Sequence, residues 1–70
     1  MNRKTVASSN IASWGYDEGS QTLEIEFHHG GVYQYEGVPP SLVRELDGAG
    51  SVGQFFHQRI KQGGFSSKKL

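Results

Sequence analysis

Two carboxylates stand two residues apart in one short stretch, Glu24 and Glu26 within residues 22–27 (TLEIEF). On a strand this spacing puts both on one face, about 6.5–7 Å apart. Paired carboxylates can serve as acid and base in glycoside cleavage. The same alternation is also typical of a half-buried strand whose outward face carries charge, and we favour this second interpretation.

Histidine is the other residue type that could do chemistry here, at His28, His29 and His57. Neighbouring residues at the end of a strand point in opposite directions, so His28 and His29 are poorly placed to share one metal ion. Cysteine is absent, which excludes a thiolate zinc site. The serine hydroxyls lie in no sequence that resembles a nucleophile elbow. We therefore expect no metal, no cofactor and no catalytic activity.

Tyr33 and Tyr35 form the most informative pair, because they alternate along a predicted strand. Alternate aromatic rings on one sheet face can stack unpaired nucleic-acid bases. Arg44, Arg59 and Lys61 follow in the sequence and could hold phosphates. The alternative is that both tyrosine rings lie beneath the helices with their hydroxyls at the rim. The sequence leaves both interpretations open.

Length and charge limit what the chain can be. Its 70 residues suffice for one domain, without room for both a full core and a deep enzyme cleft. Seven basic side chains balance seven acidic ones, but no acid occurs from residue 51 onward. A basic end permits phosphate contacts without requiring them. No apolar run approaches the roughly 20 residues of a membrane span, so we expect no membrane contact. The absence of cysteine fits a reducing compartment, and we expect a cytoplasmic location.

The elements that position these residues are three strands followed by two helices. The predicted strands are residues 9–16, 22–27 and 32–35. In the first of them Ala12, Trp14 and Tyr16 share one face, while Ile11 is out of step. Gly15 could relieve a bulge or a close backbone approach. His28 to Gly31 make the hairpin loop between the second and third strands.

Proline and serine mark the two helix starts. Pro39 and Pro40 fit the first turn of a helix, and Ser51 with Gln54 matches a capping box. Apolar stripes follow each start, at Leu42, Val43, Leu46 and Ala49, and then at Val52, Phe55, Phe56 and Ile60. We therefore predict an α+β fold, a three-stranded antiparallel meander followed by two short helices packed on one face. Residues 9–65 form the domain, between a flexible N-terminus (1–8) and a flexible C-terminal tail (66–70).

Residues 32–39 (VYQYEGVP), followed by 49–56 (AGSVGQFF), resemble the KTSC family. That family is named for a domain at the C-terminus of some lysyl-tRNA synthetases, and it also occurs as small free-standing bacterial proteins. The similarity covers about residues 9–65. His57 and Phe65 depart from it, since asparagine and tyrosine are common there. The residues that match the family pattern are Tyr33, Tyr35, Val38, Pro39, Ser51, Gly53, Phe56 and Ile60.

The resemblance implies a small non-catalytic binding module of a family without an established function. Attachment to a tRNA synthetase has suggested RNA binding for the family. Our first hypothesis is therefore RNA as partner, with Tyr33 and Tyr35 stacking on bases and Arg44, Arg59 and Lys61 contacting phosphates. The alternative is a protein–protein interaction or structural module with no nucleic-acid role. The sequence does not fix the oligomeric state, and a monomer is favoured.

Overall fold

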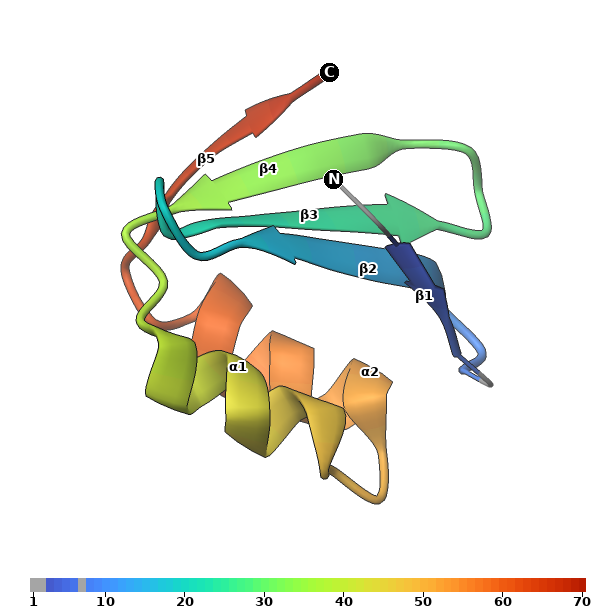
Figure 1. The fold of residues 1–70 in the computed structure, drawn as a ribbon. Helices are drawn as coiled ribbons and strands as arrows, with labels where there is room; N and C mark the ends of the chain where they lie inside the picture. The colour runs from blue at the N-terminus through green and yellow to red at the C-terminus, as the bar shows by residue number, and fades with distance from the viewer. Residues whose placement is uncertain (1–2, 7) are drawn as a thin grey trace.

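The computed structural model describes residues 3–6 and 8–70. Within them, five strands form one antiparallel sheet in chain order, and the helices lie together on one of its faces (Figure 1). The predicted α+β class is confirmed. No helix in this part of the chain is both long and apolar enough to span a membrane. The elements are β1 (Arg3–Thr5), β2 (Ile11–Asp17), β3 (Thr22–Phe27), β4 (Val32–Glu36), α1 (Pro40–Asp47), α2 (Val52–Phe55), the π-helix η1 (Phe56–Lys61) and β5 (Ser66–Lys69).

The prediction of only three strands is wrong, because strands also form near both ends of the chain. The segments 1–8 and 66–70, predicted to be flexible, contain β1 and β5, which pair with β2 and β4. Both strands are exposed along their whole length, so no apolar alternation marks them in the sequence. An ion pair from Lys4 to Asp47 also ties β1 to the end of α1. The prediction for residues 1, 2 and 7 lies outside the described residues.

β2 contains a bulge that changes which of its residues face the helices. Pairing with β3 shifts between Ile11 and Ser13, so Ala12 is the extra residue. The bulge turns Ile11 to the face of Trp14, and Ile11 is fully buried there. Gly15, the residue predicted to relieve a bulge, pairs regularly within the ladder.

The core lies between the sheet and the helices. The alternating apolar residues of β3 point toward the helices, and full burial of one such side chain contributes about 1.5–3 kcal/mol. Leu42, Val43 and Leu46 of α1 are buried against them, as predicted, whereas Ala49, the last residue of the predicted stripe, lies beyond the end of α1. The whole core consists of Ile11, Trp14, Leu23, Ile25, Tyr35, Val38, Leu42, Val43, Leu46, Phe56 and Ile60.

The turn between β4 and α1 is anchored to the second strand. Gly37 takes a positive φ of 78°, which a residue with a side chain rarely adopts. The hydroxyl of Tyr16 donates a 2.5 Å hydrogen bond to the carbonyl oxygen of Val38. Burial raises the pKa of the Tyr16 phenol, which keeps this donor protonated. The anchored turn fixes where α1 begins, at Pro40.

The second helix begins as the capping-box pattern predicts. Ser51 Oγ accepts a 3.4 Å hydrogen bond from the backbone N–H of Gln54. After one α-helical turn the chain continues as the π-helix η1, which the sequence pattern did not predict. Gly64, with φ of 83°, then turns the chain back toward β5.

Candidate binding groove

A groove runs along the helix-facing side of the sheet, between β4, β5 and the end of η1. It consists of a larger hollow of about 420 Å³ and an adjoining one of about 230 Å³. We call the two together the aromatic groove. The larger hollow is lined by Phe27, His29, Tyr33, Tyr35, Lys61, Phe65 and Ser67. The smaller one is lined by Asn10, Ile11, Phe27, His29, Gly53, Phe56, His57 and Lys61.

The two tyrosines of β4 lie at different depths in this groove. Both face the helices, because their partners across the ladder are buried residues of β3. Tyr35 is only 7% exposed, and its ring packs edge-on against Phe56 with centroids 5.2 Å apart. Burial raises the pKa of the Tyr35 phenol. Tyr33 is half-buried and meets Phe27 edge-on at 5.6 Å, so part of its ring remains open to a ligand.

The hairpin loop between β3 and β4 adds an imidazole to the groove. The ring of His29 stacks on Phe27, with centroids 5.2 Å apart and planes within 6°. Gly31 allows this packing, because a Cβ at that position would lie 3.0 Å from the Tyr33 ring and 3.2 Å from His29. His28 points elsewhere, with Nε2 2.9 Å from the carbonyl oxygen of Ser8. No cluster of three or more histidine, aspartate or glutamate side chains suited to a metal ion occurs in the described part of the chain.

Lys61 reaches the groove because the second helix ends as a π-helix. Hydrogen bonds in a π-helix join residues five apart, so Phe56 and Lys61 lie on the same side of η1. Both side chains line the smaller hollow. No described carboxylate lies within ion-pair distance of Lys61, and none lines either hollow. The groove therefore presents a cation without a counter-charge.

The two arginines predicted to contact phosphates lie outside the aromatic groove. Arg59 has its guanidinium over the ring of Phe55, 5.4 Å from the centroid, and its Nη1 lies 3.5 Å from Glu45 Oε1. Arg44 is exposed in the last turn of α1. Neither lines a hollow. Of the residues predicted to form one nucleic-acid site, the structure brings together only the tyrosines and the lysine.

Other groove residues were missed by sequence reasoning. Phe27 continues the apolar alternation of β3 beyond the buried core, which is a signal that it could line an edge. His29 carries no such signal, because its place depends on the loop geometry. Phe65 and Ser67 reach the groove only because β5 returns to pair with β4, where Ser67 lies opposite Tyr35. The groove is thus a product of the tertiary fold.

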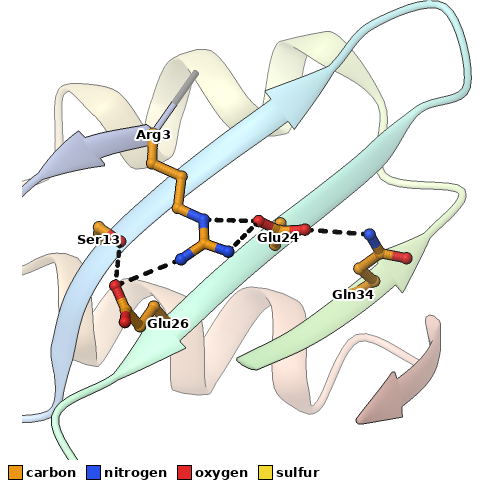
Figure 2. A network of polar contacts seen from close by, with 5 residues as sticks. All are labelled: Arg3, Ser13, Glu24, Glu26 and Gln34. Carbon is orange, nitrogen blue, oxygen red and sulfur yellow. Dashed lines mark hydrogen bonds and ion pairs between the residues drawn. The ribbon is translucent and has the colours of Figure 1, made fainter. Parts of the chain in front are cut away.

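The opposite face of the sheet is polar and carries a network that spans β1 to β4 (Figure 2). Arg3 donates from Nε to Glu24 Oε2 at 2.6 Å, and its Nη1 lies 3.3 Å from Glu26 Oε1. Ser13 Oγ donates to Glu26 Oε1 at 2.9 Å, and Gln34 Nε2 donates to Glu24 Oε1 at 3.1 Å. Both carboxylates are engaged by neighbouring strands, which matches the predicted charged outward face.

Glu24 is the centre of this network and is only 8% exposed, although the described helices lie on the other face of the sheet (Figure 1). The hydrogen bond from Gln34 lowers the pKa of the Glu24 carboxyl, and Arg3 lowers it further, while burial opposes both. The carboxyl is therefore held ionised as part of a structural contact.

Comparison with known proteins places this chain and its fold in a family. A protein from Stutzerimonas stutzeri is 46% identical over 61 residues, which are 87% of this chain and 86% of that protein. A lysine–tRNA ligase from Nostoc punctiforme is 47% identical over 62 residues, which are 89% of this chain but 11% of the ligase. The crystal structure of a KTSC domain protein from Yersinia pestis is 42% identical, with a TM-score of 0.92 over 99% of this chain and 96% of that one. Residues 7–65 match the family described as KTSC domain, and the chain belongs to that family.

Proposed function

We propose that this domain is a non-catalytic module that binds single-stranded RNA in the aromatic groove. One observation carries the proposal: half-buried aromatic rings and Lys61 share a groove that no described carboxylate lines. Stacking of a base on an aromatic side chain contributes about 1–3 kcal/mol per base. The adjacent ammonium group supplies a phosphate contact, which positions the strand without reading its sequence.

Charge is distributed over the two faces of the molecule in a way that favours an anionic partner at the groove. Glu24 and Glu26 lie on the opposite face of the sheet, where Arg3 engages them. Lys69 pairs with Tyr33 across β4 and β5, so it lies on the groove side of the sheet. A strand that followed the groove would therefore meet cations and avoid the acidic face.

The ligase relatives also support RNA as the partner class. Their name describes enzymes that join lysine to tRNA, and this chain corresponds to a small part of them. A domain of this size attached to an enzyme with an RNA substrate is well suited to hold that RNA. The activity of the whole ligase does not extend to this chain.

The proposal is tested by titrating the isotope-labelled domain with single-stranded RNA pools and with a tRNA mixture at two salt concentrations. We expect NMR shifts at Tyr33, His29 and Lys61 that weaken with salt. Lys61→Gln should weaken binding about fivefold or more and reduce the salt slope by about one. Arg44→Gln removes the same charge from an exposed site outside the groove, and it should change affinity less than twofold. An equal loss in both variants would contradict the proposal.

A protein-interaction module is the second candidate. β5 is the last strand of the sheet in the described chain, so its outer edge is open to a further strand. Phe27 and Phe65 lie in the hollow beside it and could receive an apolar side chain of that strand. If the RNA titrations cause no shifts in the groove, this function replaces the RNA one.

A further inference from the structure

The aromatic groove has the form of two unlike compartments that share one wall. Phe27, His29 and Lys61 line both hollows. Beyond this wall the larger hollow is lined mainly by the rings of Tyr33, Tyr35 and Phe65. The smaller one adds the amide of Asn10 and the imidazole of His57 to the apolar side chains of Ile11 and Phe56. A cation at the boundary between two compartments is the arrangement that a phosphate between two nucleosides requires.

We propose that the groove binds an unpaired dinucleotide step, with one base stacked in the larger hollow, the linking phosphate at Lys61, and the second nucleotide beside Asn10 and His57. This inference rests on the proposed RNA-binding function and deepens it. It assigns different tasks to the two hollows: the first provides stacking for any base, and the second reads the identity of one base.

The sizes of the hollows agree with this division. The larger hollow, at about 420 Å³, falls within the range of about 300–1,000 Å³ that drug-sized ligands occupy. The smaller one, at about 230 Å³, is too small for a whole nucleotide but does not end there. A further hollow of about 340 Å³ shares Asn10, Gly53 and His57 with it. The second nucleotide therefore has room to extend past the shared residues.

Asn10 is held so that its side chain is presented to this second compartment. Its backbone N–H donates to Ser8 Oγ at 3.3 Å, and its carbonyl oxygen accepts from the N–H of His28 at 2.9 Å. No described partner engages the Asn10 amide group. A side-chain amide offers both donors and an acceptor, which is what recognition of a base edge needs.

His57 adds an imidazole ring to the same compartment. The amide nitrogen of Gln62 lies 3.2 Å from His57 Nε2. Gln62 engages Nε2, and no described partner engages the other ring nitrogen, Nδ1. With Asn10, Nδ1 makes a pair of polar groups suited to one base edge, next to a lysine suited to the phosphate.

The test compares nucleoside monophosphates with the full set of dinucleoside monophosphates, followed by NMR on the labelled domain. We expect dinucleotides to bind at least fivefold tighter than the mononucleotides, with a base preference at one of the two positions. Asn10→Ala should abolish that preference. Tyr33→Leu should weaken all dinucleotides alike, because stacking tolerates every base. Ser41→Ala, an exposed polar change on α1, is the control and should alter neither.

The outcomes separate this inference from the function on which it rests. If dinucleotides shift the groove but bind no tighter than mononucleotides, the two-compartment assignment is overturned and RNA binding stands. The same holds if Asn10→Ala leaves the base preference intact. If neither dinucleotides nor longer single strands shift any groove residue, both proposals are overturned. Asn10 is exposed, so its replacement leaves the core intact and the comparison interpretable.

Discussion

At Gly53 in α2, the nearby hydroxyl of Ser8 leaves little room for a side chain. A Cβ at this position would lie 3.0 Å from Ser8 Oγ, which itself accepts the N–H groups of Asn10 and Ile11. A side chain there would require Ser8 Oγ to shift by a few tenths of an ångström, which would disturb these two hydrogen bonds. The other residues of the family pattern also have structural tasks, with Ser51 as a helix cap and Tyr35, Val38, Phe56 and Ile60 in the core. Tyr33 differs from them, because its ring is half-buried in the groove.

Glu24→Gln should make the stability of the domain less sensitive to acid. The Glu24 pKa is lowered in the folded state, mainly by Gln34 and then by Arg3. The carboxylate therefore stabilises the fold above the ordinary glutamate pKa of about 4.3, and this contribution is lost as the pH falls through the folded-state pKa. At neutral pH the variant should lose about 1–3 kcal/mol of unfolding free energy, and the difference from the unchanged chain should shrink in acid. Urea unfolding at several pH values measures both effects.

Glu26→Gln is the matched control for this experiment. The Glu26 side chain is 43% exposed, whereas that of Glu24 is 11% exposed, although both contact Arg3. We expect the control to cost less at neutral pH, since exposed ion pairs contribute about 0–1 kcal/mol. Equal losses in the two variants would show that the network acts as one unit, without a buried centre.

At the scale of elements, side-chain pattern predicted the three inner strands and both helix starts. β2, β3 and β4 alternate apolar and polar residues, and Ser51 caps the second helix as expected. β1 and β5 are exposed and polar throughout, so only backbone pairing with a neighbour makes them strands. Their positions could not be read from the pattern, because pairing partners are set by the whole fold.

The candidate site was predictable to the same extent. The alternating tyrosines placed β4 in the site. The sequence did not show which side chains of the second helix would face that site. In a regular α-helix Arg59, three residues after Phe56, would lie on the side of Phe56, and Lys61 would not. In the π-helix Lys61 lies on the side of Phe56 instead of Arg59. Lys61 therefore lines the groove, and Arg59 lies beside Glu45. A single extra residue per turn thus decides which cation a ligand meets.

Deletion of Gln58 should convert η1 to an α-helix without moving Lys61. After the deletion Lys61 stands four residues after Phe56, which again puts the two on one side of the helix. We expect the thermal midpoint to be equal or higher, and in any case not lower by the 4–8 °C that correspond to about 1 kcal/mol in a domain of this size. Lys61 should remain in the groove, so the NMR shifts that RNA causes at Lys61 should persist.

Deletion of Ala49, which precedes the helix cap, is the comparison for that variant. It removes one residue from the loop between α1 and α2. This loop contains no π-helical turn that could lose a residue and become α-helical. We expect it to destabilise the domain. If deleting Gln58 destabilised the fold as much, the π-helix would be required for packing and would not be a tolerated insertion.

At the scale of the whole molecule, both outer edges of the sheet are basic. β1 carries Arg3 and Lys4, and β5 carries Lys68 and Lys69. An open strand edge can pair with the edge of another molecule, and charged side chains on edge strands oppose this pairing. Two β5 strands that met edge to edge would bring like charges together, and each such pair costs up to about 1 kcal/mol.

Replacing both Lys68 and Lys69 with valine should therefore increase self-association. We expect the double variant to elute as larger species at concentrations where the unchanged chain does not, as measured by size-exclusion chromatography with light scattering. Arg44→Val makes a similar change on α1, away from the edge, and should leave the elution unchanged. Association of Arg44→Val to the same degree would show that general loss of charge, and not the edge, is responsible.

The order of strands in the sheet has a consequence for how the chain folds. β1 to β4 each pair with their neighbour in sequence, so these strands can form by successive short loop closures. β5 must wait for the helices between residues 40 and 61 before it reaches β4. We therefore expect the groove wall at Phe65 and Ser67 to be completed last during folding. Because no residue of β5 belongs to the core, we also expect detachment of β5 to open the groove while the core stays closed.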